Sequence, residues 1–201
     1  MADTRRGELV LASASPFRRR MLEAAGLSFR VVPAEVDEAR IRQRMPAGNL
    51  AHVAQTLAQA KATAVSQAQP SALVIGADQV LAFGDRLFNK PKSFDEARTQ
   101  LKELRGHAHQ LHTAATLAQA GKILWSHVET ARLVMRPFSD AFLDRYLAEM
   151  GTRVCQTVGA YEIEGLGIQL FERIEGDSFT IVGLPLLPLL AELRARGAIA
   201  T

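Results

Sequence analysis

The feature of this sequence that most constrains its fold is an almost unbroken apolar run over residues 73–81, LVIGADQVL. Such a run is typical of a β-strand covered on both faces, as in α/β sheets. The run carries a carboxylate, Asp78, near its middle. A charged group inside an apolar strand is costly unless it is paired, bound to a metal or placed where the strand meets a cleft. An aspartate held by backbone donors or a turn is the structural alternative.

Strand and helix patterns alternate along the rest of the chain. They predict strands over 8–12, 27–33 and 167–174, a hairpin of 109–119 and 122–135, helices over 16–25, 48–67 and 93–104, a helix capped by Ser139, and a Leu-rich C-terminal helix. The helix that follows Ser15 has a serine N-cap, and we expect its inward face to consist of Phe17, Met21, Leu22 and Ala25. This order predicts an α/β fold with a mixed sheet.

Composition limits the classes of protein that the chain can belong to. Its 201 residues, 48% hydrophobic and 22% charged, suit one domain over 1–201 that could be elaborated into two lobes. A single cysteine excludes an internal disulfide and a cysteine-rich zinc site. Neither a membrane-spanning segment nor an N-terminal secretory leader is visible, so we expect a cytoplasmic protein. The small net charge of +3 gives no reason to expect a nucleic-acid partner.

The turn between the strand over 8–12 and the following helix is a candidate phosphate site. A helix N-terminus offers unpaired N–H groups and a partial positive charge, to which Ser13 and Ser15 add hydroxyls and Arg18 and Arg19 add full charges. An ordinary serine cap followed by solvated basic residues is an equally good interpretation of the turn alone. The sequence lacks the GxxxxGK(S/T) and GxGxxG patterns, which disfavours P-loop and dinucleotide-binding proteins.

Charged residues elsewhere in the chain could complete a phosphate-handling site. Asp78 could bind Mg2+ or orient and deprotonate a water, and the other candidates are Glu35, Asp37, Glu38, Lys61 and Lys90. Each of the others alone is more commonly a surface acid or lysine. Together they suit metal-assisted attack on a phosphoanhydride. The spacing of the five histidines disfavours zinc, and the absence of GxSxG disfavours a serine hydrolase.

Several ordered motifs together resemble the Maf proteins, also called Maf/septum formation inhibitor-like nucleotide pyrophosphatases. The resemblance spans nearly the whole chain, through the segments LVLASASP over 9–16, GADQ over 76–79, NKP over 89–91 and GLPL over 183–186. It implies an elongated mixed-sheet α/β fold similar to that of inosine triphosphate pyrophosphatases, with the active site in a cleft between two lobes. It also implies a nucleoside triphosphate as substrate, and a homodimer is left open.

The family pattern assigns roles to particular residues. The phosphate-binding serine and arginine of the family fall on Ser13 and Arg18, its lysines on Lys61 and Lys90, its acidic metal-site residue on Glu38 and its catalytic aspartate on Asp78. The resemblance therefore implies Mg2+ or Mn2+ held by Glu38 and Asp78, with Asp78 activating a water and pyrophosphate as the leaving group.

Three positions resemble a particular branch of the family. Phe17, Gln79 and Glu164 are similar to an aromatic residue, a glutamine and a glutamate in the branch linked to 7-methyl-GTP, whereas many members have Arg, Thr and Gln there. A glutamate can accept hydrogen bonds from guanine, and a cationic methylated base favours a carboxylate and an aromatic face. The resemblance thus favours a modified guanine nucleotide as the substrate.

Two other functions remain open on the sequence alone. The resemblance also implies a link to arrest of septum formation, so the chain could be a cell-division regulator that binds nucleotide or a protein without turnover. A phosphatase or nucleotidyltransferase with the same charged cleft is the third possibility. Asp78, Glu38 and Lys90 favour an enzyme, because binding alone does not need a water-activating acid.

Overall fold

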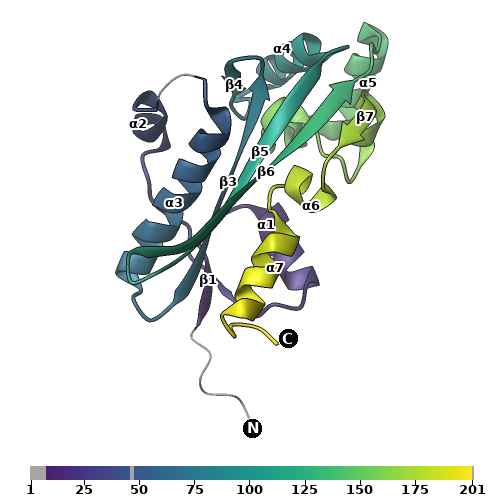
Figure 1. Cartoon of the computed structure of the whole chain (residues 1–201). Helices are drawn as coiled ribbons and strands as arrows, with labels where there is room; N and C mark the ends of the chain where they lie inside the picture. Colours follow the sequence, from purple (N-terminus) through teal and green to yellow (C-terminus); the bar gives the residue numbers. More distant parts are fainter. Residues whose placement is uncertain (1–7, 46–47, 201) are drawn as a thin grey trace. The chain divides into compact units, whose positions relative to one another are not determined.

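The computed structural model of the chain, drawn in Figure 1, describes residues 8–45 and 48–200. Residues 1–7, over which the sequence predicts no secretory leader, lie outside the described part. The strands are β1 (Leu9–Leu11), β2 (Arg30–Val31), β3 (Leu73–Phe83), β4 (Arg86–Phe88), β5 (Ala108–Gln119), β6 (Lys122–Met135) and β7 (Phe171–Glu175). The α-helices are α1 (Pro16–Ala24), α2 (Glu38–Gln43), α3 (Leu50–Ala68), α4 (Phe94–Leu104), α5 (Asp140–Met150), α6 (Ser178–Val182) and α7 (Leu186–Ala195). Three short 3-10 helices, η1 (Gly151–Cys155), η2 (Val158–Ala160) and η3 (Leu166–Leu170), lie between α5 and β7.

The strands form one mixed sheet, which confirms the predicted α/β class. Its order is β2-β1-β3-β5-β6-β7, with β4 paired to β3 beside this path. β1 pairs in parallel with β2 and β3, whereas β3–β4 and β6–β7 are antiparallel pairs. β5 and β6 form the predicted hairpin, in which Ala120 and Gly121 both have positive φ angles of 48° and 76°. Two such residues are what the right-handed twist of a two-residue hairpin turn requires.

The chain divides into two compact units. The first comprises the chain up to Gln79, residues 113–129 and the segment from Gly183 onward, and the second comprises 80–112 and 130–182. In the first unit α3 lies on one side of β1 and β3, and α1 and α7 lie on the other (Figure 1). The core on the α3 side contains Val10, Ala12, Val65, Ala72 and Val74. Alternate residues of β3 therefore face α3, beginning with Val74.

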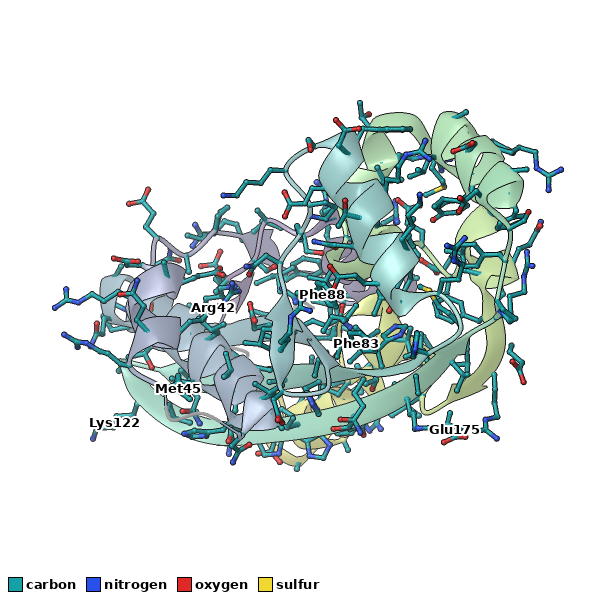
Figure 2. The ribbon with its side chains drawn as sticks, turned by 90° about the horizontal axis from the view of Figure 1, so that it is seen from above. Arg42, Met45, Phe83, Phe88, Lys122 and Glu175 are labelled. Atoms are coloured by element: carbon teal, nitrogen blue, oxygen red, sulfur yellow. The ribbon has the colours of Figure 1, made fainter. Side chains whose placement is uncertain are left out.

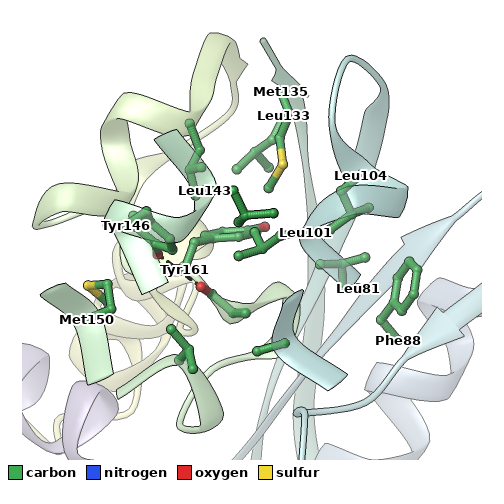
Figure 3. Packing of buried hydrophobic residues seen from close by; sticks show 14 of the residues in the cluster. Leu81, Phe88, Leu101, Leu104, Leu133, Met135, Leu143, Tyr146, Met150 and Tyr161 are labelled. Carbon is green, nitrogen blue, oxygen red and sulfur yellow. Dashed lines mark hydrogen bonds between the residues drawn. The ribbon is translucent and has the colours of Figure 1, made fainter. Parts of the chain in front are cut away.

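The second unit has its own hydrophobic core, shown in Figure 3. Leu101 and Leu104 of α4 pack there with Leu143 of α5 and with Leu133 and Met135 of β6. Phe83 and Phe88 stack with ring centroids 6.0 Å apart at the tight β3–β4 connection (Figure 2). Aromatic pairs at this separation add stability beyond their buried area.

Two predicted strands are shorter or displaced. The strand expected over 27–33 is reduced to Arg30–Val31, because β2 is an edge strand that pairs only with β1 and both its residues are exposed. The strand expected over 167–174 begins only at Phe171, after η3. A Cβ at Gly167 would lie 2.5 Å from the carbonyl oxygen of Glu162, so the chain folds back on itself too closely there for an extended strand.

The helices agree better with the prediction than the strands do, with four differences. α1 begins at Pro16 as predicted, but its buried face consists of Arg18, Met21 and Leu22 rather than the predicted set with Phe17 and Ala25. α3 begins at Leu50 after an Asn49 cap, and neither α2 nor α6 was predicted. None of the described helices is long and apolar enough to cross a membrane.

Candidate functional site

The turn from β1 into α1 is built from the hydroxyls of Ser13 and Ser15. Ser15 caps α1, its Oγ accepting a hydrogen bond from the Arg18 N–H at 3.4 Å, and its own N–H donates to Ser13 Oγ at 3.3 Å. Such hydrogen bonds satisfy two of the donors at this turn and hold its backbone in place. The Ser15 hydroxyl thus acts as an ordinary helix cap, whereas Ser13, which is 6% exposed, is buried in the turn.

Arg18 ties this turn to two other backbone segments of the first unit. Its Nη1 donates to Ser13 Oγ at 3.0 Å and to the carbonyl of Ala77 on β3 at 2.9 Å, and its Nε donates to the carbonyl of Gly183 at 2.8 Å. Burial lowers the pKa of the guanidinium, and the charges of Asp78 and Glu38 oppose that shift. Because an arginine remains protonated in proteins, a full positive charge is fixed beside the turn.

The neighbours of Arg18 on α1 point elsewhere. Arg19 is exposed and pairs with Glu23, one turn along the helix, at 2.7 Å. Phe17 is half-buried and carries the Arg20 guanidinium over its ring, 4.8 Å from the centroid. The structure therefore brings Arg18, and not Arg19, into contact with Ser13 and β3.

A close approach between α3 and β3 brings further charged residues to this strand. A Cβ at Gly76 would lie 2.3 Å from the carbonyl oxygen of Ala58 and 2.7 Å from Ala62 Cβ. Only glycine on the strand and small residues on the helix allow the two backbones to approach so closely. Asp78 follows Gly76 by two residues and so occupies the same face of β3. Lys61, adjacent to Ala62 on α3, reaches it from above that face.

The ammonium group of Lys61 lies between two carboxylates. Its Nζ is 2.5 Å from Asp78 Oδ1 and 2.8 Å from Glu38 Oε1 on α2. The side chains of Lys61 and Asp78 are only 12% and 7% exposed, whereas that of Glu38 is 39% exposed. A buried carboxylate is tolerated when a cation pairs with it, so this contact explains how Asp78 can lie within an apolar strand.

Several positive charges surround Glu38. Burial alone would raise its pKa, but the hydrogen bond from Lys61 and the charges of Lys61, Arg42 and Arg18 outweigh this effect, and the pKa lies below its usual value. Arg42, labelled in Figure 2, contacts Glu38 Oε2 at 3.1 Å. The other two predicted acids play different parts, since Asp37 caps α2 and Glu35 is exposed.

The second oxygen of Asp78 is buried without a hydrogen-bond partner among the described residues. An unpaired buried carboxylate oxygen is unusual and indicates a position for a water or a cation. In residues 8–45 and 48–200 there is no group of three or more His, Cys, Asp or Glu side chains that could enclose a metal ion. The residues nevertheless fit Mg2+, which proteins commonly hold with one or two carboxylates while the substrate phosphates supply further oxygens.

Gln79 lies on the opposite face of β3 from Asp78. Its Nε2 donates a 2.9 Å hydrogen bond to the hydroxyl of Thr113 on β5, a fully buried residue. The other end of the amide faces Gly183, where a Cβ would lie 4.0 Å from Gln79 Oε1. Sequence reasoning did not identify Thr113 or Arg42, because neither stands in a recognisable motif. Gly76 with Ala58 and Ala62 could have been found, since small residues four apart on a helix indicate a close contact.

Lys90 and Glu164 belong to the second unit. Lys90 is exposed and follows β4, where Gln100 of α4 donates a 3.0 Å hydrogen bond to the carbonyl of Asn89 and so anchors the segment. Glu164 is exposed in a turn closed by a 3.3 Å hydrogen bond from the Gly165 N–H to the Glu162 carbonyl. The predicted residues other than Lys90 and Glu164 lie in the first unit. Within it, direct contacts join Arg18 to Ser13 and Lys61 to Glu38 and Asp78.

A helix N-terminus with a fixed arginine, beside the buried carboxylate of Asp78, the partly exposed carboxylate of Glu38 and a lysine, is typical of an α/β protein that handles phosphate compounds. The sequence model of one family, described as Maf-like protein, matches residues 8–196. The chain therefore belongs to the Maf family, as its motifs predicted.

Known proteins of two kinds are similar to the chain. It is 53% identical to the 7-methyl-GTP pyrophosphatase of Mesorhizobium japonicum, over 96% of this chain and 98% of that protein. It is 50% identical to the nucleoside triphosphate pyrophosphatase of Bradyrhizobium diazoefficiens, over 96% and 95% of the two chains. Among solved structures, the Ham1 protein of Staphylococcus aureus is similar with a TM-score of 0.43 and 15% identity, covering 65% of this chain and 72% of that one.

Proposed function

We propose that the chain is a nucleoside triphosphate pyrophosphatase, which hydrolyses its substrate to nucleoside monophosphate and pyrophosphate. Relatives that match almost the whole chain at about half identity are named as pyrophosphatases of this kind. The observation that carries the proposal is the buried carboxylate of Asp78, one oxygen of which is held by Lys61 while the other has no partner among the described residues. A carboxylate arranged in this way can hold and deprotonate a water.

The residues of the first unit have separate roles in the reaction. Ser13, Arg18 and the N-terminus of α1 bind phosphate oxygens, with the Arg18 guanidinium already held by its backbone contacts. A water attacks the α-phosphorus, the bond from that phosphorus to the bridging oxygen breaks, and pyrophosphate leaves with the electron pair. Oδ2 of Asp78 accepts the proton of the water. Lys61 neutralises charge on the leaving group.

Glu38 and Asp78 would hold a divalent cation, Mg2+ or Mn2+. When bound, such an ion polarises the α-phosphate as a Lewis acid. The fit rests on Glu38 Oε1 and Asp78 Oδ1, which both lie against the same nitrogen of Lys61 and so face one position. Oxygen ligands of this type are those that Mg2+ and Mn2+ prefer.

For the base of the substrate we propose a modified guanine of the 7-methyl-GTP type, bound by Phe17, Gln79 and Glu164. Relatives at about half identity, among them that of Mesorhizobium japonicum, are named as 7-methyl-GTP pyrophosphatases, and Phe17 offers a half-buried aromatic ring. The amide of Gln79 is oriented by Thr113, and the carboxylate of Glu164 is exposed. A cationic base is attracted both to an aromatic face and to a carboxylate. Arg19 and Ser15 contribute charge and helix capping near the phosphates.

A screen of substrates tests the activity and separates it from the alternatives. Purified protein is incubated with ordinary and modified nucleoside triphosphates and Mg2+, Mn2+ or Co2+, and products are separated by chromatography. We expect monophosphate and pyrophosphate in equal amounts, most rapidly from 7-methyl-GTP. Orthophosphate as the first product would indicate a phosphatase, and binding without any product would indicate the division regulator. We place the enzyme in the cytoplasm, where nucleotide pools are found, with a homodimer as its proposed assembly.

Replacing Asp78 by Asn tests the catalytic step. Asn retains the shape of the side chain but cannot accept a proton, so we expect pyrophosphate release to fall by at least about a hundredfold, the typical contribution of a general base. Circular dichroism and thermal melting check that the variant folds. Asp37→Asn is the matched control, because Asp37 caps α2 and does not contact Lys61. An Asp78→Asn protein with full activity would refute the assignment.

A further inference from the structure

A single ammonium group occupies the space between the two proposed metal ligands. Lys61 Nζ is within 2.8 Å of Glu38 and 2.5 Å of Asp78, and its side chain is only 12% exposed. A lysine whose only function were to bind phosphate would direct its ammonium towards solvent or the substrate. In this structure the ammonium is instead directed at the carboxylates.

A divalent cation and this ammonium cannot share the same carboxylate oxygens. A cation of this size binds its oxygen ligands at about 2.1 Å, and the ammonium lies almost as close to Asp78 Oδ1. Two like charges brought together in a poorly solvated place repel strongly. The guanidinium of Arg42, 3.1 Å from the other oxygen of Glu38, adds a further positive charge at this position.

We propose that Lys61 is an internal counter-cation, which closes the divalent metal site of Glu38 and Asp78 until a triphosphate draws the ammonium away. The inference rests on the proposed function and adds the order in which the enzyme binds nucleotide and metal. A triphosphate offers Lys61 several anionic oxygens in exchange for the two carboxylates. The carboxylates are then available to the metal, which arrives together with the nucleotide. The free enzyme binds the metal weakly for the same reason.

The exchange can be made by the side chain of Lys61 while its backbone stays in place. The helix is held against β3 by the Gly76 contact with Ala58 and Ala62, so the backbone of Lys61 is fixed. Its four-carbon side chain can change rotamer while the backbone stays in place. Arg18 cannot take this role, because the carbonyls of Ala77 and Gly183 hold its guanidinium in place and it cannot move between the carboxylates and a triphosphate.

Binding of Mn2+ to the protein without nucleotide tests the proposal, measured by titration calorimetry and by the electron paramagnetic resonance of free Mn2+. Lys61→Met removes the charge while keeping the stem. We expect Mn2+ to bind the variant at least about tenfold more tightly than the wild type, which corresponds to about 1.4 kcal/mol. Lys122→Met, at an exposed lysine of the same unit, is the matched control and should bind Mn2+ as the wild type does.

Other roles for Lys61 predict a different Mn2+ affinity for the variant. If Lys61 served only to bind phosphate, or if it supported the carboxylates as metal ligands, Lys61→Met would bind Mn2+ no more tightly than the wild type, and the proposal would be wrong. The double variant Lys61→Met with Glu38→Gln removes one of the two carboxylates and should lose the gain. A gain that persisted in the double variant would place the added metal elsewhere and overturn the proposal as well.

A measurement on the wild type covers the case in which Lys61→Met does not fold. The 15N-labelled ammonium of Lys61 is followed by nuclear magnetic resonance, since hydrogen bonds to carboxylates slow its exchange with water. We expect Mg2+ alone to leave this signal unchanged, and Mg2+ with a non-hydrolysable triphosphate analogue to shift it. A shift with Mg2+ alone would contradict the proposal.

Different results would refute the proposed function and the counter-cation role of Lys61. If no nucleoside triphosphate yields pyrophosphate, the proposed function is wrong, whatever the Mn2+ affinities are. If pyrophosphate is released but Lys61→Met does not bind Mn2+ more tightly, only the counter-cation role is wrong.

Discussion

Gly76 on β3 lies directly beneath Ala62 on α3, so closely that a Cβ on the glycine would lie 2.7 Å from the alanine Cβ. The same Cβ would lie 2.3 Å from the carbonyl oxygen of Ala58. Because the obstacle includes helix backbone, a side chain at this position cannot be accommodated by a rotamer change. The contact determines the distance between α3 and β3 and hence the reach of Lys61 to Asp78.

We therefore expect Gly76→Ala to damage both stability and the site. Overpacking of this kind costs typically about 1–3 kcal/mol of unfolding free energy. The helix would also move away from the strand, so the Lys61–Asp78 contact would lengthen and activity would fall by more than the loss of folded protein explains. Urea unfolding and the specific activity of the folded fraction measure the two effects.

Gly165→Ala provides the matched control for this change. A Cβ at Gly165 has open space around it, and its backbone is not in the left-handed region. The substitution should alter the unfolding free energy by no more than about 0.5 kcal/mol. Equal stability of the Gly76→Ala protein and the wild type would show that α3 is not held against β3 by this contact.

The sequence predicted those parts of the site that depend on local chemistry. The Ser15 cap and Pro16 determine where α1 begins, and the apolar run predicted β3 with its carboxylate. It could not predict which side of α1 faces the core, because the pattern places Phe17 and Arg18 on adjacent positions and hydrophobicity favours the phenylalanine. Arg18 is buried instead because backbone carbonyls of β3 and of Gly183, distant in sequence, satisfy its donors.

Contacts between distant segments also explain what the sequence missed around Asp78. The sequence indicated that the carboxylate needs a partner, but not that the partner is Lys61, because no local rule relates a position on α3 to one on β3. α2, which carries Glu38, is too short for its periodicity to be recognised. The family pattern named these residues, and the packing of α3 supplies the physical reason for their proximity.

Arg18 and Arg19 should respond differently to the same conservative change. Lysine at position 18 cannot make the hydrogen bonds to Ser13, Ala77 and Gly183 simultaneously, and it would leave buried acceptors unpaired. We expect Arg18→Lys to lose about 1–3 kcal/mol of unfolding free energy and to raise KM for the triphosphate. Thermal melting and steady-state kinetics measure these effects.

Arg19→Lys is the control at the next residue. Its side chain is exposed and pairs with Glu23, and such surface pairs contribute little, about 0–1 kcal/mol. Stability should therefore be nearly unchanged. A larger increase in KM for Arg19→Lys than for Arg18→Lys would show that the exposed arginine, and not the buried one, binds the triphosphate.

Thr113 should affect base selection through Gln79. Valine has nearly the shape of threonine but cannot accept the hydrogen bond from Gln79 Nε2, so the amide of Gln79 would lose its fixed orientation. Because a hydrogen bond contributes about 1 kcal/mol, we expect Thr113→Val to reduce the preference for 7-methyl-GTP over UTP by roughly five- to tenfold in kcat/KM. The kcat for UTP should change little.

Thr113→Ser distinguishes orientation from packing in this experiment. Serine restores the hydroxyl but leaves out the methyl group, so it should recover the base preference even if it is less stable than the wild type. If Thr113→Val and Thr113→Ser altered the preference equally, the hydroxyl would not be responsible, and Gln79 would not be positioned by Thr113.

His109 in the second unit should make stability depend on pH. Its ring is 2% exposed, and burial lowers its pKa to about 4. Its Nε2 lies 2.8 Å from the hydroxyl of Tyr161, and its Nδ1 is buried without a hydrogen-bond partner among the described residues. The folded protein therefore holds this imidazole neutral at a pH at which an exposed histidine would be protonated.

The direction of the effect follows from the two protonation equilibria. In the unfolded chain a histidine takes up a proton near pH 6.5, whereas the folded chain does so only near pH 4. Stability from this group is complete above about pH 6.5 and is lost as the pH falls towards 4. Since one pKa unit corresponds to about 1.4 kcal/mol, the total loss is roughly 3 kcal/mol.

Replacing His109 by Gln tests this prediction, because glutamine can still hydrogen-bond to Tyr161 but does not titrate. Urea unfolding between pH 4 and 7 should show a stability of the variant that depends less steeply on pH than that of the wild type, by close to one proton in this range. Identical slopes for His109→Gln and the wild type would mean that another group carries the acid sensitivity and that His109 is not held neutral by burial.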